Sequence, residues 1–285
     1  MTRLAILSDI HGNLPALEAV LKDIDQFHVN HVIVAGDAVN WGPFSKQVME
    51  RITRGGFATI RGNNELYLTD YDTPRAPAHW KNYTIPPWTL NQLGDHWRNV
   101  IAAWPDTLTL RFPDAPAVRV VHGSPMNAWQ AMFPTTDDTA MANMLGEVEE
   151  TTVIAAHTHL AMDRQVGHWH ILNPGTVGLP LNGIFGATYM LLDGDARGWR
   201  STPRHVPFNY DPIFEEFEHL DFVAACGVVG HLAVEEYKTA RLHVYPFIRW
   251  HQECYPSAPQ TMDLLEPFSK VNKWDYTDPA YHVNL

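Results

Sequence analysis

The chain contains five short apolar runs, and each run is followed by a side chain that can bind a metal ion. The runs cover residues 4–7, 32–36, 57–60, 118–121 and 152–156. Such short apolar runs are typical of buried β-strands. Loops after the carboxyl ends of parallel strands converge at one edge of a sheet. The pattern therefore predicts an α/β fold whose sheet edge gathers seven side chains: Asp9, His11, Asp37, Asn63, His122, His157 and His159.

The N-terminal part of the chain has the pattern of two βαβ units. Leucines and other apolar residues recur at helical spacing between residues 14 and 24, and Pro15 suits a first helical turn. Gly42-Pro43 opens a second helix that continues to about Arg54, where Gly55-Gly56 ends it. These helices connect three strands, so parallel pairing with right-handed crossovers is expected.

Helical and strand-like patterns alternate along the rest of the chain. Residues 65–105 are rich in tryptophan and proline and are expected to be a helical insertion. Residues 108–112 and 118–121 predict a hairpin in a second sheet, with further strands at 165–172 and 186–192. Helices are predicted to follow at 213–225 and 232–249. We therefore divide the chain into a domain at 1–208 and a C-terminal extension at 209–285.

Composition narrows the class of protein. The chain has 285 residues, 45% of them hydrophobic, which is enough to bury a full core. Its formal net charge of -12 leaves no broad basic surface for nucleic acid. Two distant cysteines, Cys226 and Cys254, provide neither a thiolate metal site nor a disulfide framework. No apolar run could span a bilayer and no signal peptide is evident, so we expect a cytoplasmic protein without a membrane partner.

The chemistry of the seven side chains points to two metal ions. Two carboxylates, one amide and four imidazoles without a thiolate favour Mn, Fe or Zn over Ca. Seven ligands exceed what one ion takes comfortably. Two ions about 3.5–4 Å apart that share a carboxylate would use all of them, and such a pair clamps the attacking and leaving oxygens of phosphoryl transfer.

The motifs around these ligands resemble those of the calcineurin-like metallophosphoesterase superfamily, in the same order. The blocks are Ser8–Asn13, Gly36-Asp37, Gly62–Glu65, Val121–Pro125 and His157-Thr158-His159. Residues 173–180 also resemble a loop of its small bacterial and archaeal phosphodiesterase-like branch, and the resemblance covers roughly residues 3–205. Each block alone would be a weak signal, because the chain has 16 histidines.

The resemblance implies a four-layer αββα sandwich with two divalent or trivalent metal ions at the sheet edge. Mn is the first expectation, with Fe or Zn as alternatives. A hydroxide shared by the ions would attack phosphorus. The implied ligands are Asp9, His11 and His159 for the first ion and Asn63, His122 and His157 for the second, with Asp37 as the bridge.

One position departs from the superfamily pattern. Most members have a histidine after the ligand asparagine, often assigned to the leaving group or the transition state, whereas this chain has Asn64. An asparagine donates a hydrogen bond but delivers no proton at neutral pH. We therefore expect Asn64 to contact substrate and to favour leaving groups that need little protonation, such as those of aryl or nucleotide diesters. His79 or His96 of the insertion could restore the proton.

Several neighbours of the ligands have more than one interpretation. Asn13, Arg61 and Trp41 could contact phosphate or base, but Arg61 could equally pair with a structural carboxylate. Asn64 could cap a helix that begins near Leu66. The tryptophans of the insertion could stack a base, although a local core is the commoner use.

The leading functional hypothesis is a metal-dependent phosphoesterase for small phosphodiester or nucleotide substrates, and a homo-oligomer is compatible with it. Asp37 and Asn64 are its candidate catalytic residues. A phosphoserine or phosphothreonine protein phosphatase is the alternative enzyme. A non-catalytic scaffold of the same fold is a third reading, against which the complete ligand set argues.

Overall fold

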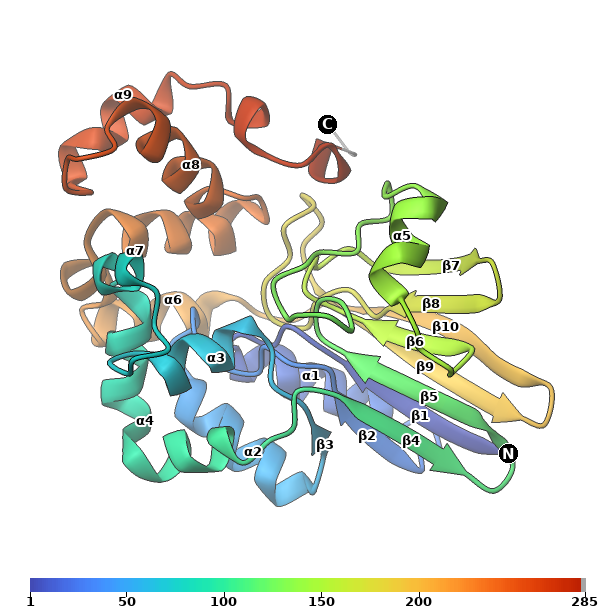
Figure 1. Ribbon diagram of the computed structural model, residues 1–285. Helices are drawn as coiled ribbons and strands as arrows, with labels where there is room; N and C mark the ends of the chain where they lie inside the picture. The colour runs from blue at the N-terminus through green and yellow to red at the C-terminus, as the bar shows by residue number, and fades with distance from the viewer. Residues whose placement is uncertain (283–285) are drawn as a thin grey trace.

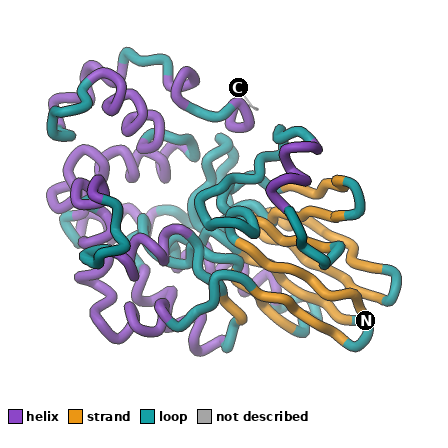
Figure 2. Tube along the Cα trace, viewed as in Figure 1, coloured by secondary structure: helices purple, strands orange, loops and turns teal. Residues whose placement is uncertain are grey.

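Two five-stranded β-sheets pack face to face at the centre of the sandwich (Figures 1 and 2). The computed structural model describes residues 1–282. The first sheet has the order β10-β9-β1-β2-β3. β1, β2 and β3 run parallel, as the βαβ pattern predicts, whereas β9 is antiparallel to β1. The strands are Thr2–Leu7 (β1), His31–Val34 (β2), Ala58–Thr59 (β3), Ala187–Asp195 (β9) and Gly198–Val206 (β10).

The second sheet has the order β4-β5-β6-β8-β7, with β5, β6 and β8 parallel and an antiparallel strand at each edge. The predicted hairpin is present as β4 and β5. The prediction of a single strand at 165–172 is wrong, because Gly167 at φ 58° turns the chain between β7 and β8. The strands are Leu108–Phe112 (β4), Ala115–Val121 (β5), Thr152–Ala155 (β6), Met162–Val166 (β7) and Trp169–Asn173 (β8).

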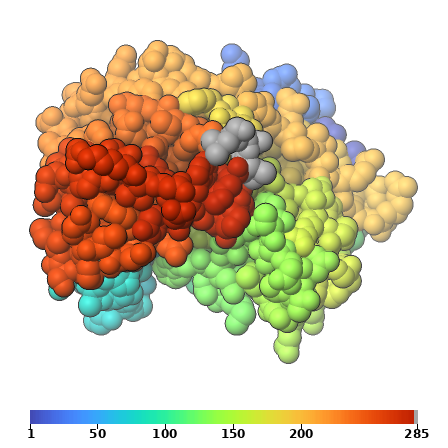
Figure 3. Space-filling view, turned by 90° about the horizontal axis from the view of Figure 1, so that it is seen from above, coloured from blue at the N-terminus to red at the C-terminus, as the bar shows by residue number. Residues whose placement is uncertain are grey.

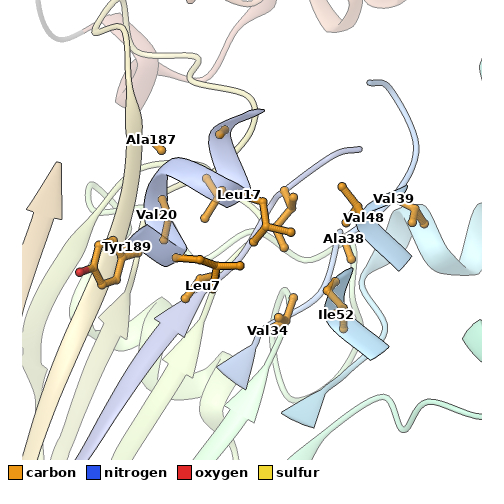
Figure 4. Close-up of a cluster of buried hydrophobic side chains, with 14 of the residues drawn as sticks. Leu7, Leu17, Val20, Val34, Ala38, Val39, Val48, Ile52, Ala187 and Tyr189 are labelled. Atoms are coloured by element: carbon orange, nitrogen blue, oxygen red, sulfur yellow. The ribbon is translucent and has the colours of Figure 1, made fainter. Parts of the chain in front are cut away.

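Helices cover the outer face of each sheet, which confirms the predicted αββα sandwich. Leu14–Ile24 (α1) and Ser45–Gly55 (α2) lie on the first sheet, where Leu17, Val20 and Ile52 pack on Leu7 and Val34 (Figure 4). Asp138–Leu145 (α5) lies on the second sheet. The apolar inner faces of the two sheets meet in a separate core that water does not reach.

Most of the remaining helices gather at one side of the sandwich (Figure 2), whereas residues 279–282 reach the loop after β6. The insertion is helical, as expected, and the C-terminal helices share a hydrophobic cluster with it, in which the rings of Trp88 and Phe222 lie 4.6 Å apart. No helix within residues 1–282 is both long enough and apolar enough to cross a membrane. These helices are Asn63–Asp70 (α3), Ala78–Asn82 (η1), Ile85–Ala102 (α4), Asp211–His219 (α6), Phe222–Thr239 (α7), Val244–Cys254 (α8), Met262–Leu264 (η2), Leu265–Ser269 (α9), Lys273–Tyr276 (η3) and Pro279–His282 (η4).

The helix boundaries predicted for the C-terminal extension are wrong. The chain turns at Asp221 (φ 48°) and at Ala240 (φ 53°), inside both predicted helices. The first turn lets Phe222 bury its ring against Phe217, at 4.6 Å between ring centres. Neither turn carries a glycine or proline, so packing rather than local sequence decides where these helices end.

Candidate metal centre

The loops that follow β1, β2, β5 and β6 bring the expected ligands into two clusters. Asp9, His11 and His159 form one cluster, and Asp37, His122 and His157 form the other. Within each cluster the ligand atoms lie within 4.8 Å of one another. Asn63, the first residue of α3, joins the second cluster because its Oδ1 lies 3.0 Å from Nε2 of His122.

Asp37 lies between the two clusters. Its Oδ2 is 3.3 Å from Nε2 of His122 in one cluster and 3.7 Å from Nε2 of His11 in the other. The Nε2 atoms of His11 and His159 are 3.2 Å apart. This spacing is compatible with two ions that share the Asp37 carboxylate.

The backbone of five expected ligands is left-handed. Asp9, His11, Asp37, His157 and His159 have φ values between 48° and 69°. This conformation costs a non-glycine residue roughly 1–3 kcal/mol and is concentrated at functional sites. Apolar strands fix the start of each loop, and the strained turns gather the ligands beyond the ends of these strands.

Glycines make room for these loops. A Cβ on Gly62 would collide with Oδ1 of Asp37, and a Cβ on Gly36 would lie 2.6 Å from Nδ1 of His122. Gly36 also has φ 88°, which side chains rarely adopt. Gly36 and Gly62 therefore allow the ligand loops to lie close together, and Gly36 also allows the chain to turn.

Backbone carbonyls orient two of the imidazoles. Nδ1 of His122 lies 2.8 Å from the carbonyl of Ala35, and Nδ1 of His159 lies 2.6 Å from that of Leu179. Each ring then directs Nε2 at the centre, as metal-binding histidines commonly do. Loop 173–180 supplies the Leu179 carbonyl.

Burial sets the protonation of the other two imidazoles. Burial lowers the pKa of His11 and of His157 to about 4, so both are neutral at pH 7, which is the form that binds metal. Burial alone would raise the pKa of the Asp37 carboxyl, but His122, His11 and His157 lower it overall. Asp37 therefore stays ionised.

Unpartnered buried atoms show that metal ions fit this centre. Asp9 is fully buried, and neither of its carboxylate oxygens has a hydrogen-bond partner among the described residues. Nε2 of His159 is 3.2 Å from Oδ1 of Asp9, but not in a hydrogen-bonding direction. A buried carboxylate without partners is costly unless a cation compensates it. The two Asp/His clusters are thus consistent with a binuclear metal site.

Asn64 orients Asp37. Its side-chain Oδ1 accepts hydrogen bonds from Nδ2 of Asn40 (2.8 Å) and Nε1 of Trp41 (3.0 Å). These two donors leave Nδ2 to donate to Oδ2 of Asp37 at 2.5 Å, while the backbone N–H of Asn64 donates to Oδ1 at 2.9 Å. Thr89 of α4 continues the network by donating to Asn40. The alternative prediction that Asn64 caps a helix is wrong, because α3 begins earlier, with Gly62 as its N-cap.

Glu65 is a site residue that sequence reasoning missed. Its buried carboxylate accepts hydrogen bonds from the backbone N–H groups of Gly62, Asp37, Ala38 and Val39 at 2.7–3.2 Å. It thereby ties the N-terminus of α3 to the loop that carries Asp37. Burial, and next the charge of Asp37, raise the pKa of Glu65 to about 7. A glutamate three residues after the N-cap was the available signal.

The structure gives Asn13 and Arg61 structural contacts. Asn13 caps α1 by accepting from the N–H of Ala16 and donates to the carbonyl of Gly178. Arg61 pairs with Asp106 at 2.7 Å, which is the structural alternative raised from the sequence. Both side chains thus make contacts within the protein, whereas we expected them to contact phosphate.

The two histidines that could restore a proton donor are outside the ligand clusters. His79 and His96 are exposed on the insertion, next to Tyr83 and Trp97 respectively. Neither belongs to the two clusters of possible metal ligands found within residues 1–282. The insertion instead reaches the centre through Thr89 and its network.

Two tyrosines of the C-terminal extension touch the ligand loops. The hydroxyl of Tyr237 on α7 donates to the carbonyl of His11 at 3.3 Å. The hydroxyl of Tyr281 on η4 donates at 2.9 Å to the carbonyl of Thr158, which separates His157 from His159. No motif of the sequence marked either tyrosine, because both contacts join residues far apart in the chain.

Comparisons with known proteins agree with this architecture. The family model described as the calcineurin-like phosphoesterase superfamily domain matches residues 2–197. The chain is 26% identical to phosphodiesterase YfcE of Escherichia coli over 206 residues, which are 68% of this chain and 89% of YfcE.

Two solved structures share the fold. Hypothetical protein PH1004 of Pyrococcus horikoshii aligns at a TM-score of 0.70 and 21% identity, over 86% of this chain and 99% of its own. A metallophosphoesterase of Sphaerobacter thermophilus aligns at 0.66 and 22% identity, over 84% of this chain and 99% of its own. With the αββα sandwich, two Asp/His clusters at its edge and a family match over most of its length, the chain belongs to the calcineurin-like phosphoesterase superfamily.

Proposed function

We propose that the protein is a metal-dependent phosphodiesterase that hydrolyses small aryl or nucleotide-type substrates. Asp9, His11 and His159 would hold one ion, Asn63, His122 and His157 the other, and Asp37 would bridge them. When bound, such a pair activates water and neutralises phosphate oxygens. Mn²⁺ is the metal we propose, because the donors are oxygen and imidazole nitrogen without thiolate.

The observation that carries this proposal is the fixed orientation of Asn64. Its amide oxygen is taken by Asn40 and Trp41, and its amide nitrogen faces Asp37. Asn64 therefore acts as a positioning residue for the bridging carboxylate, and it has no proton to give a leaving group. General acid help is typically worth about 10²–10⁴ in rate, so its absence favours esters whose leaving groups need no proton. The similarity to YfcE, which is named a phosphodiesterase, supports the same substrate class.

A substrate panel with added Mn²⁺ tests the proposal. We expect bis(p-nitrophenyl) phosphate to be hydrolysed with a higher kcat/KM than serine phosphate or a phosphoserine peptide. A higher kcat/KM for the phosphopeptide would instead support a protein phosphatase. Full occupancy by two ions without turnover of any substrate would support a non-catalytic scaffold.

A further inference from the structure

The loop that follows the expected ligand His122, residues 124–130, turns back on itself. The N–H of Ser124 donates to the carbonyl of Asn127 at 3.0 Å, which closes a turn. A Cβ on Gly123 would lie 2.7 Å from the carbonyl oxygen of Ala128, so the returning backbone lies directly against the residue that follows His122. Trp129 therefore emerges beside one expected ligand of the second ion.

A hydrogen bond joins Trp129 to the helix that carries the other ligand. Its indole Nε1 donates to the hydroxyl of Tyr67 at 3.1 Å. Tyr67 is four residues after Asn63 on α3, so the two side chains share one helix face about 5–6 Å apart. Trp129 is thus fixed between the loop of His122 and the helix of Asn63.

Aromatic rings contact the indole of Trp129, and a large part of it is exposed. Trp80 is buried, with its ring 4.6 Å from Tyr67 and 6.2 Å from Trp129. Trp129 is 41% exposed, and Met126 on the same loop is 72% exposed. An isolated exposed apolar side chain needs no explanation. Here the two side chains share the loop that follows an expected metal ligand, and the larger donates a hydrogen bond and contacts a buried ring.

We propose that Trp129 and Met126 form a subsite that stacks a flat aromatic group, an aryl ring or a nucleobase, carried by the phosphoester substrate. The inference rests on the proposed function, because the phosphate of that substrate would lie at the metal centre. Tyr67, the partner of Trp129, follows the expected ligand Asn63 on α3 by about one helical turn, roughly 5.4 Å. Indole rings stack every base, so the subsite selects aromatic groups without reading their edges.

Binding of AMP and ribose 5-phosphate to the Mn²⁺-loaded protein tests the subsite, because these probes differ only in the base. We expect calorimetry to give a Kd for AMP at least about tenfold lower than for ribose 5-phosphate. Trp129→Ala should bring the ratio of the two Kd values close to one, and Trp129→Phe should keep most of it. Tyr255→Ala, at a similarly exposed aromatic of the C-terminal extension, should leave it unchanged.

Other outcomes overturn the subsite. Equal affinity of the two probes for the wild-type protein, absence of binding by both, or a ratio that Trp129→Ala does not lower would each do so. The hydrolysis of bis(p-nitrophenyl) phosphate separates this failure from a wider one. If that diester is turned over while AMP shows no advantage, the subsite fails and the proposed function stands. If no phosphoester is turned over, the proposed function fails as well.

Discussion

Asp37 has the most constrained side chain in the centre. Both of its oxygens accept hydrogen bonds from Asn64, and Oδ2 lies near Nε2 of His11 and of His122. Because Gly62 has no side chain, its backbone can lie close to this carboxylate. A single side chain thus joins the two ligand clusters, and its charge is fixed by the imidazoles around it.

Replacing this carboxylate tests the bridging role. Asp37→Asn should turn one Asp37 oxygen into an N–H₂ group that faces either the donors of Asn64 or the metal. We expect bound Mn²⁺ to fall from two ions to one or none, and kcat/KM for bis(p-nitrophenyl) phosphate to fall roughly 10³-fold or more. Metal analysis of the dialysed protein and steady-state kinetics measure both. Undiminished turnover by the variant would show that Asp37 does not bridge the two ions.

Among the elements, α3 connects most parts of the centre. Its first residue, Asn63, is an expected ligand. Its second residue, Asn64, donates a hydrogen bond to Asp37, and its third, Glu65, accepts hydrogen bonds from backbone N–H groups of the loop after β2. Its N-terminus also favours negative charge through the helix dipole. The position of this short helix therefore determines the geometry of the second cluster.

The contribution of Glu65 can be measured by an amide substitution. In Glu65→Gln one of the two acceptor oxygens becomes a donor that faces buried N–H groups. We expect the free energy of unfolding of the metal-free protein to fall by about 1–3 kcal/mol in urea titrations. Glu50→Gln, on an exposed face of α2, is the matched control and should change little. Equal stability of both variants would show that these hydrogen bonds contribute nothing.

At the scale of the molecule, the C-terminal extension spans the open edge of the sandwich. In Figure 3 the red C-terminal part of the chain reaches from the helical side to the green segment that contains α5. Tyr281 lies at this end, where its ring is 5.7 Å from Phe133 and its hydroxyl holds the carbonyl of Thr158. The extension therefore contacts loops of both ligand clusters.

Removing one hydroxyl tests whether the extension positions metal ligands. Tyr281→Phe should leave the Tm of the chelated protein nearly unchanged but reduce the rise in Tm on addition of Mn²⁺. One hydrogen bond is worth about 0.5–1.5 kcal/mol, so we expect metal affinity to fall between two- and tenfold. Tyr255→Phe serves as the control. A lower Tm without metal, together with an undiminished rise on metal addition, would indicate a purely structural role.

The extension also contains a buried carboxylate that should make stability depend on pH. Glu236 accepts from the N–H groups of His243 and Val244, and burial raises its pKa from 4.5 to about 7. A raised carboxyl pKa means that the folded chain binds the proton more tightly. This contribution to stability is therefore complete below pH 4.5 and is lost as pH rises to about 7.

A comparison with Glu236→Gln isolates this effect, since glutamine keeps an acceptor oxygen but does not titrate. Urea titrations of the metal-free proteins at pH 5 and pH 8 give the two free energies of unfolding. We expect the wild-type value to fall relative to that of the variant by up to about 3 kcal/mol between these pH values. Parallel pH profiles would mean that Glu236 titrates normally in the folded chain.

The sequence alone determined the sandwich and the order of its ligands. Apolar runs that end in Asp, Asn or His can be recognised in the local sequence. They predict both the strand and the loop after it, where the side chain lies. Five ordered motifs made that signal specific. Local sequence also marked the insertion as helical.

Only the tertiary structure decided how the ligands are held. The four hydrogen bonds to Glu65, the orientation of Asn64 and the tyrosines of the extension join segments far apart in the chain, and no local pattern encodes such contacts. The turns at Asp221 and Ala240 likewise result from packing. Residue chemistry thus set which atoms could bind a metal, whereas long-range packing set their orientation, because a side chain's direction depends on neighbours that the sequence does not place.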